Sequence, residues 1–268
     1  MAIGATVGRS GINELADVLV VQHLLNRWLK VQGEPTLQAD GDAGARTLAA
    51  ITAFQTRVQQ SSRPDGRIDP GGLTWNALSS WTPPSALLSG AAWWQANQGR
   101  YPNSARLDDL APAFRKKVTA FLDALEGAGA SVDIASTRRD LRRAQLMSHS
   151  WRIARGTLQP DDAPSILGVP IAWQHATPAR SRAAAQEMAD RFEIAFEPSL
   201  TSLHIEGRAI DMTISWAGTL RIRDHAGRLR SLTTPRSGNT NRDLHAVGAS
   251  YGVLKLLSDP PHWSETGR

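Results

Sequence analysis

The most informative segment of the chain reads Ser202-Leu-His-Ile-Glu-Gly-Arg-Ala-Ile-Asp-Met-Thr-Ile-Ser215. Its second half, from Ala209 to Ser215, alternates between apolar and polar residues, which predicts a strand with one buried face. Gly207 permits a turn between this strand and the piece that carries His204. Such a turn would let His204 and Asp211 point into one cleft.

A second motif, Asp259-Pro-Pro-His262-Trp263, follows near the end of the sequence. Two imidazoles and one carboxylate are a ligand set that a catalytic zinc uses when its fourth position stays open for water. Two prolines before His262 would restrict the loop and reduce the entropy of preorganising that ligand. We therefore expect His204, Asp211 and His262 to bind one Zn²⁺ per chain. Asp259 would accept a proton from the bound water and return it to the leaving amine.

Composition limits the classes of protein to consider. The chain has 268 residues, a net charge of +5 and no cysteine. The length suits one large domain or two modest ones, and the absence of cysteine excludes disulfides and thiolate metal sites. A basic chain without a compact Lys/Arg run favours an anionic partner such as a bacterial envelope and predicts no nucleic-acid binding. No signal peptide or membrane span is visible, so we expect synthesis in the cytoplasm.

Residues 1–82 predict a small all-helical domain. Apolar residues at helical spacing indicate two helices separated by the turn Asp40-Gly-Asp-Ala-Gly44. A second turn, Asp65 to Gly72, repeats the Asp-Gly start and leads into a short helix through Trp75. Residues 83–104, rich in Pro, Ser, Gly and Asn, predict a linker.

Residues 105–268 predict an α+β domain with a small antiparallel sheet. Besides the strand at 209–215, the pattern indicates a strand, a hairpin and three helices. The strand is Val132–Ala135, the hairpin joins Leu220–Arg223 to Leu229–Leu232, and the helices are Leu107–Leu125, Pro178–Phe192 and Leu244–Leu257. The fold class is therefore α+β, with an all-helical N-terminal domain joined to the larger domain.

The N-terminal domain resembles the peptidoglycan-binding module of the three-helix type that is found beside bacterial wall hydrolases. The resemblance rests on four motifs in order: Val21-Gln22-x-Leu24-Leu25, Asp40-Gly41-x-x-Gly44, Thr47-x-x-Ala50-Ile51-x-x-Phe54-Gln55 and Asp65-Gly66-x-Ile68-Asp69. It implies that this domain holds the protein on bacterial peptidoglycan. Any small bundle with two turns is the alternative interpretation.

The larger domain resembles the D-alanyl-D-alanine carboxypeptidase and endopeptidase family of zinc peptidases. The motifs are Ser202-x-His204-x-x-Gly207-x-Ala209-x-Asp211 and Asp259-x-x-His262-Trp263. The resemblance covers about residues 107–268 and is weaker over 155–200. It implies that the two histidines and the aspartate between them bind zinc. It also implies that Asp259 stands where the family has its catalytic acidic residue, usually Glu.

The same resemblance implies further substrate contacts. Ser136-Thr-Arg-Arg139 resembles a Ser-x-x-Arg element whose arginine steadies the substrate carbonyl or carboxylate. The register favours Arg139 as this catalytic residue and leaves Arg138 as the alternative, while a solvated Arg-rich face is the structural alternative. Ser202 matches a hydroxyl that contacts substrate in some relatives. We expect Trp263 to form a wall of the site.

These expectations combine into a two-domain zinc metallopeptidase that hydrolyses peptidoglycan in the periplasm or outside the cell. The bond could be L-Ala–D-Glu, the D-Ala–diaminopimelate cross-link or the terminal D-Ala–D-Ala. Without a signal peptide, such a protein would be a phage endolysin released through holin-type membrane holes, or an antibacterial effector delivered by a secretion machine. The alternative is a catalytically inactive wall-binding component of a phage tail or secretion spike, which the Asp at position 259 keeps open.

Overall fold

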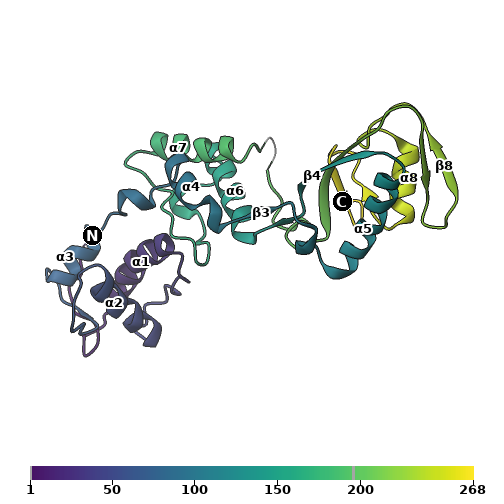
Figure 1. Cartoon of the computed structure of the whole chain (residues 1–268). Helices are drawn as coiled ribbons and strands as arrows, with labels where there is room; N and C mark the ends of the chain where they lie inside the picture. Colours follow the sequence, from purple (N-terminus) through teal and green to yellow (C-terminus); the bar gives the residue numbers. More distant parts are fainter. Residues whose placement is uncertain (1, 195–196) are drawn as a thin grey trace. The chain divides into compact units, whose positions relative to one another are not determined.

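A computed structural model describes residues 2–194 and 197–268 (Figure 1). This part of the chain has an α+β fold with eight α-helices and small antiparallel sheets. Two compact units are present, and each is built from two segments of sequence. The first unit contains residues 1–96 and 149–195, and the second unit contains residues 97–148 and 196–268. Across the described ranges, no helix combines the length and apolarity that crossing a membrane requires.

The start of the first unit contains the three helices that the sequence predicts. Their bounds are α1 (Leu15–Gln32), α2 (Ala45–Arg57) and α3 (Leu73–Ser79), and β1 (Val7–Gly8) pairs antiparallel with β2 (Arg67–Ile68). The predicted apolar stripes of α1 and α2 meet in one core. Trp28 of α1 and Phe54 of α2 are both buried, and their rings meet edge to face with centroids 5.5 Å apart. This contact is favourable beyond the area it buries.

A buried glutamine fixes the first Asp-Gly turn. The amide nitrogen of Gln22 donates to Asp40 Oδ1 at 2.9 Å, to the Asp42 carbonyl at 3.0 Å and to Thr47 Oγ1 at 3.1 Å. The amide oxygen of the same side chain accepts from the Gly41 nitrogen at 2.9 Å. One side chain therefore satisfies the backbone of a turn that has no regular secondary structure.

The second Asp-Gly turn is fixed in the same way. Gln55 Nε2 donates to Asp65 Oδ1 at 2.6 Å, to the Arg67 carbonyl at 3.1 Å and to Thr74 Oγ1 at 3.1 Å. Its oxygen accepts from the Gly66 nitrogen at 2.9 Å. A helix glutamine thus forms the same set of hydrogen bonds to an Asp-Gly turn and a threonine at two places in the first unit.

Residues 83–104, which the sequence favours as a linker, contain several short elements: η1 (Ser85–Leu87), α4 (Ala91–Asn97), η2 (Gln98–Arg100) and β3 (Asn103–Ser104). Trp93 and Trp94 of α4 are buried. The Trp93 indole donates to the Pro170 carbonyl at 3.1 Å, and Trp94 contacts Phe192 with ring centroids 4.4 Å apart. Part of this stretch therefore packs into the first unit.

Other elements complete the segment between residues 141 and 194. They are α6 (Leu141–Ala154), η4 (Pro160–Asp162) and α7 (Pro178–Arg191). The prediction of a helix from Pro178 is confirmed, and Thr177 caps it by accepting a hydrogen bond from the Arg180 nitrogen at 3.2 Å. Proline at the first helical position suits this start, because its missing N–H would have no partner there.

A four-stranded antiparallel sheet organises the second unit, with strand order β4-β6-β10-β9. Its strands are β4 (Ser131–Ser136), β6 (Ala209–Ser215), β10 (His262–Ser264) and β9 (Leu254–Lys255). The predicted hairpin is confirmed as β7 (Leu220–Arg223) and β8 (Leu229–Leu232), and β5 (Arg138–Arg139) pairs with β3. The helices α5 (Pro112–Gly127) and α8 (Arg242–Ser250) contribute to the same core as the sheet.

The predicted alternation along β6 is confirmed. Ile210, Met212 and Ile214 are at most 1% exposed and pack with apolar residues of α5 and α8. Asp211 lies between them in sequence and so projects from the opposite face of the sheet. One face of the sheet therefore forms the core, and the other face carries the polar side chains.

Two predicted helix boundaries in the second unit are wrong. The helix predicted from Leu107 starts at Pro112, after a 3-10 turn at Leu107–Asp109. The last helix ends at Ser250 and not at Leu257. Gly252 has a φ of 76°, which breaks the helix, and the next residues form β9 in place of a continued helix.

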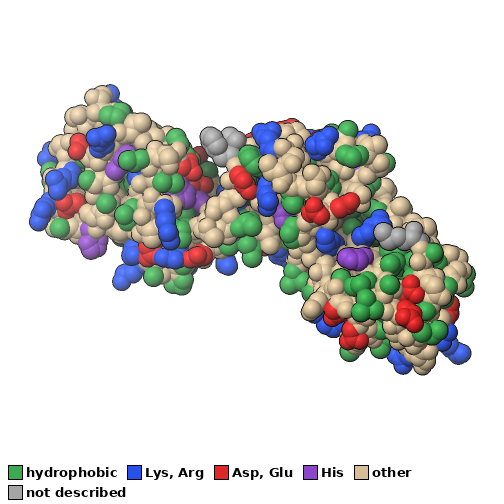
Figure 2. All heavy atoms as spheres, turned by 180° about the vertical axis from the view of Figure 1, so that it is seen from behind, with side chains coloured by type: hydrophobic (Ala, Val, Ile, Leu, Met, Phe, Trp, Pro, Cys, Tyr) green, Lys and Arg blue, Asp and Glu red, His purple; other side chains and the backbone are tan. Residues whose placement is uncertain are grey.

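The charges on the molecular surface are mixed. Over the face drawn in Figure 2, Lys and Arg side chains alternate with Asp and Glu side chains, and they do not form one continuous basic field. Ion pairs such as Arg67–Asp69 and Arg208–Glu206 illustrate this mixing. On this face, therefore, the basic side chains of a chain with a net charge of +5 do not gather into one patch.

Candidate metal centre

Two strands place the first two candidate ligands. His262 begins β10 and pairs directly with Asp211 of β6. Residues that face each other in an antiparallel pair project from the same face of the sheet, so both side chains leave the face opposite the core. The sheet register alone thus joins two residues that are remote in sequence.

The third candidate ligand, His204, lies in the turn that precedes β6. Gly207 ends this turn with a φ of 67°, and a Cβ at that position would lie 2.8 Å from the Asp109 carbonyl oxygen. Any other residue would therefore clash and be strained. The turn returns the chain sharply enough for His204 to face Asp211, as the sequence predicts.

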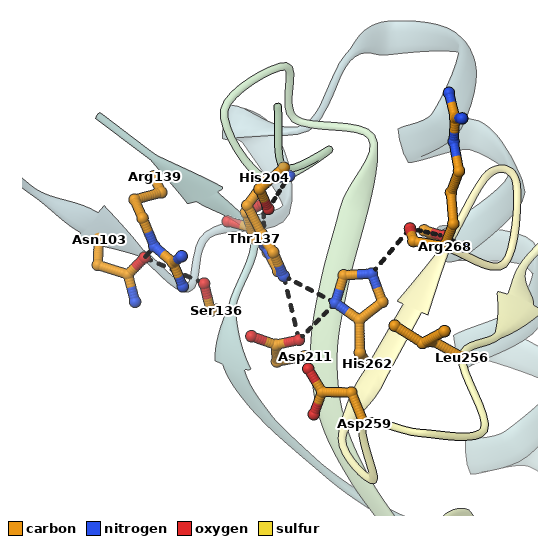
Figure 3. A network of polar contacts seen from close by, with 12 residues as sticks. Asn103, Ser136, Thr137, Arg139, His204, Asp211, Leu256, Asp259, His262 and Arg268 are labelled. Atoms are coloured by element: carbon orange, nitrogen blue, oxygen red, sulfur yellow. Dashed lines mark hydrogen bonds and ion pairs between the residues drawn. The ribbon is translucent and has the colours of Figure 1, made fainter. Parts of the chain in front are cut away.

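The three ligand atoms form a triangle with equal edges. His204 Nε2, His262 Nδ1 and Asp211 Oδ1 are each 3.1 Å from the other two (Figure 3). A tetrahedral zinc site with bonds of about 2.0–2.1 Å has ligand atoms roughly 3.3 Å apart. The observed spacing therefore fits a small divalent cation, and these residues could hold a metal ion.

Hydrogen bonds to main-chain carbonyls orient both imidazoles. His204 Nδ1 lies 3.1 Å from the Thr137 carbonyl oxygen, and His262 Nε2 lies 3.3 Å from a main-chain oxygen of Arg268, the last residue of the sequence. Each of these main-chain oxygens can only accept, so the proton of each neutral ring belongs on the nitrogen that faces the oxygen. The lone pairs of the other two nitrogens then converge with the carboxylate. This arrangement of outer hydrogen bonds is typical of metal-binding histidines.

The electrostatics of the triangle favour a cation. Burial alone would raise the pKa of the Asp211 carboxyl, but the two neighbouring imidazoles outweigh burial and lower that pKa well below its usual range. His204 and His262 are 3% and 6% exposed, so little water reaches their ring nitrogens. A carboxylate and two inward lone pairs at this spacing repel one another unless positive charge lies among them.

Asp259 lies beside this centre in the loop between β9 and β10. The residue is exposed, and its nitrogen donates to the Leu256 carbonyl at 3.3 Å. Figure 3 shows it in the loop next to Asp211 and His262. Burial lowers the pKa of Arg139, and the negative charges of Asp211 and Asp259 partly oppose that effect, so all three charged groups share one electrostatic environment.

Arg139 is anchored at the edge of the same site. Its nitrogen donates to the His204 carbonyl at 3.0 Å, and its Nε donates to Asn103 Oδ1 at 3.4 Å. Burial lowers the pKa of Arg139, and the nearby Asp211 and Asp259 carboxylates oppose that effect. Arg138 is exposed and is the neighbouring residue of the same short strand, so it projects to the other side. The structure therefore brings Arg139, and not Arg138, to the candidate centre.

Ser202 lies at the start of the turn that carries His204. The Ser202 hydroxyl accepts a long hydrogen bond of 3.4 Å from the His204 nitrogen, and its side chain is half-buried. This contact steadies the turn.

The expected role of Trp263 is wrong. Its side chain is fully buried and lies among core residues, with its ring centroid 5.6 Å from that of Phe121. Trp263 pairs with Ile210 of the apolar face, whereas the preceding His262 projects from the polar face. The alternation of β10 thus makes Trp263 a core residue, and it does not line the site.

Several residues of the site give no signal in the sequence. Thr137 and Arg268 contribute main-chain carbonyls, which every residue possesses. Asn103 accepts hydrogen bonds from Arg139 and from the Ser136 hydroxyl, but a single asparagine in a polar stretch is not distinctive. Lys255 is buried next to the loop that carries Asp259, and its burial is visible only in three dimensions.

Comparison with known proteins finds no matching family model, no matching curated protein and no matching solved structure. The geometry of His204, Asp211 and His262 and the chemistry of those groups therefore indicate what this site can do.

Proposed function

We propose that the chain is a zinc-dependent hydrolase that cleaves an amide bond in the peptide stem or cross-link of bacterial peptidoglycan. The observation that carries this proposal is the triangle of His204, Asp211 and His262, with equal edges of 3.1 Å and both histidine tautomers set by carbonyls. Two nitrogens and one carboxylate oxygen, in a chain without cysteine, suit Zn²⁺.

Bound zinc with an open position would lower the pKa of a coordinated water and polarise a substrate carbonyl. Asp259 is exposed and adjacent to the triangle, so its carboxylate is available to accept a proton and later to donate one to the leaving amine. Arg139, held by Asn103, supplies a fixed positive charge for the oxygen of the scissile bond as negative charge develops there.

The first unit supports peptidoglycan as the substrate. Its two Asp-Gly turns, each fixed by a helix glutamine, match the motifs by which residues 1–82 resemble a peptidoglycan-binding module. A unit that binds the wall would raise the local concentration of substrate for the hydrolytic unit. The net charge of +5 favours an anionic envelope. A phage endolysin and an antibacterial effector delivered by a secretion machine are the two settings that we propose.

Digestion of purified sacculi tests the proposal. The zinc-loaded full-length chain should release free amines without new reducing sugar ends, and mass spectrometry of the fragments should identify the broken bond. His204→Ala serves as the inactive control. New reducing ends would instead identify a glycan-cleaving enzyme.

A second candidate function is wall binding without catalysis, as in an inactive component of a phage tail or secretion spike. The observation that favours it is Asp259 itself, because its side chain is one methylene shorter than glutamate and has less reach. Metal analysis separates the two candidates: the hydrolase should carry about one zinc per chain, whereas a metal-free chain that binds sacculi would support the second.

A further inference from the structure

A buried lysine lies at the centre of the loop that presents Asp259 and His262. Lys255 is 9% exposed, although lysine is seldom buried unless its charge is compensated. Its ammonium donates to three main-chain carbonyls, those of Leu256, Asp259 and His262, with distances of 2.5 Å to Asp259 and 3.1 Å to His262. An ammonium group has three N–H donors, so these contacts use its whole capacity.

The same three carbonyls also close the loop through its own main chain. The Leu256 nitrogen donates to the His262 carbonyl at 3.1 Å, the His262 nitrogen donates to the Asp259 carbonyl at 3.1 Å, and the Asp259 nitrogen donates to the Leu256 carbonyl at 3.3 Å. Each oxygen therefore accepts one main-chain N–H and one N–H of Lys255. The loop wraps around the ammonium in the way that a carbonyl cage surrounds a cation.

Electrostatics explain why a cation is needed there. The negative ends of three carbonyl dipoles point at one buried position, where the local dielectric is low and their mutual repulsion is strong. The Trp263 ring adds a favourable contact, with its centroid 5.8 Å from Lys255 Nζ. Removing the ammonium would leave the three oxygens facing one another, so the loop would open and displace Asp259 and His262.

We infer that Lys255 is a positioning residue for the metal centre, which holds the loop in the one form that presents His262 Nδ1 to the ligand triangle and Asp259 beside it. This inference rests on the proposed function. It assigns Lys255 no contact with substrate or metal. Its effect reaches the centre through the main chain of the loop.

The first test compares the zinc affinity of the wild type with that of Lys255→Met, by competition with a chromophoric chelator. Loss of the ammonium that holds the loop should weaken zinc binding by about 10- to 100-fold, as does loss of other groups that orient metal ligands. Lys255→Arg should not restore the affinity, because a planar guanidinium cannot direct three donors at carbonyls that converge on one point. Lys117→Met is the matched control, since it breaks a half-exposed ion pair of 2.8 Å with Glu265 in the same unit. It should leave zinc affinity unchanged.

A thermal measurement separates positioning from general stabilisation. Zinc raises the Tm of a protein that binds it only when folded, by an amount that depends on its affinity. The zinc-induced rise in Tm should be smaller in Lys255→Met than in the wild type. A residue with a merely structural role would lower the Tm equally with and without zinc. The visible spectrum of the Co²⁺-substituted protein should also change, because it reports ligand geometry.

Chemical rescue uses the absence of cysteine from the chain. In Lys255→Cys the single thiolate can be alkylated in denaturant with 2-bromoethylamine, where sulfur displaces bromide and leaves a side chain that ends in an ammonium. Alkylation with 2-bromoethanol gives a side chain of the same length that ends in a neutral hydroxyl. After refolding, the ammonium product should regain zinc affinity to within a few fold of the wild type, and the hydroxyl product should not.

The possible outcomes separate the two proposals. Equal zinc affinity in the wild type and Lys255→Met, or equal rescue by both alkylated products, would overturn the positioning role and leave the hydrolase proposal intact. A wild type without measurable zinc affinity would instead overturn the proposed function. If Lys255→Met does not fold, the two alkylated products still decide the question, because both fill the space of the lysine side chain.

Discussion

His262 and Trp263 are adjacent in β10, yet one side chain belongs to the candidate metal centre and the other to the hydrophobic core. His262 pairs with Asp211, and Trp263 pairs with Ile210. A single strand of three residues therefore couples the packing of the core to the position of a candidate ligand. Shifting its register by one residue would exchange the two side chains and destroy both features.

This relationship predicts that substitution of Trp263 affects stability more than chemistry. Trp263→Ala should cost about 3–5 kcal/mol of unfolding free energy, because it leaves a cavity in the core. Trp263→Phe should cost less and should retain zinc and activity per folded molecule, as measured by urea denaturation and by digestion of sacculi. A loss of substrate affinity in a stable Trp263→Phe protein would instead indicate that Trp263 contacts substrate.

The metal content of the protein should depend on each of His204, Asp211 and His262. His204→Ala removes one of three protein ligands, so the purified chain should lose most of its zinc after dialysis, as measured by elemental analysis. His225→Ala is the control, because His225 is exposed and lies on the turn between β7 and β8. Equal zinc content in both variants would contradict the proposed centre.

Asp259 should affect the rate without affecting metal content. Asp259→Asn keeps the size of the side chain but removes its ability to accept a proton, so kcat should fall by about 10²- to 10⁴-fold while zinc stays bound. Asp243→Asn, at an exposed position of α8, should have little effect on either quantity. Zinc loss in Asp259→Asn would indicate a ligand and argue against proton transfer.

Arg139 and Arg138 provide a matched pair of neighbouring arginines. Arg139→Ala should lower kcat by about 10²- to 10³-fold, because it removes the positive charge proposed to stabilise the negative charge that develops on the substrate oxygen. Arg138→Ala should change kcat by less than about twofold, since this side chain is exposed on the other side of β5. Steady-state kinetics on soluble wall fragments measure both, and equal effects would favour a general role of positive charge in binding.

The first unit should lose stability in mild acid because of His149. Burial, and to a lesser degree Arg152, lowers the pKa of His149 to about 4. The folded state therefore prefers the neutral ring, while the unfolded state takes up a proton as the pH falls below about 6.5. The contribution of His149 to the free energy of unfolding is fully present above pH 6.5. It is lost progressively as the pH falls from 6.5 to 4, and the loss reaches about 3 kcal/mol.

Urea denaturation of metal-free protein at several pH values tests this dependence. Seven of the nine tryptophans belong to the first unit, so tryptophan fluorescence mainly follows that unit. Among them, Trp173 lies against His149 with ring centroids 6.1 Å apart. In His149→Gln the free energy of unfolding should depend less on pH between pH 6.5 and 4 than in the wild type, whereas His225→Gln should keep the dependence of the wild type. The prediction fails if the wild type and His149→Gln respond to pH with the same slope.

The sequence predicts the parts of the site that depend on residue type and local periodicity. His204, Asp211 and His262 stand out because few other functions need these groups around a glycine turn and a strand. The alternation of β6 correctly places Asp211 opposite Ile210 and Met212. The two-residue period of β10 also applies to Trp263, but β10 has only three residues, which is too short for the pattern to be recognised in the sequence.

Long-range contacts explain what the sequence could not predict. The main-chain oxygens that orient His204 and His262 belong to Thr137 and Arg268, and a main-chain oxygen carries no residue-specific signal. The helix predicted through Leu257 had adequate periodicity, yet Gly252 ends it and pairing with β10 makes Lys255 part of a strand. Tertiary pairing thus overrides local propensity at this position.

The discontinuity of the two compact units has a consequence for protein engineering. Because residues 149–195 belong to the same compact unit as residues 1–96, one cut in the chain cannot separate the first unit from the second. A chimera joined near residue 82 would strip the later segment of its packing partners and expose apolar surface to aggregation. Transfer of the first unit to another protein would therefore have to include both segments together.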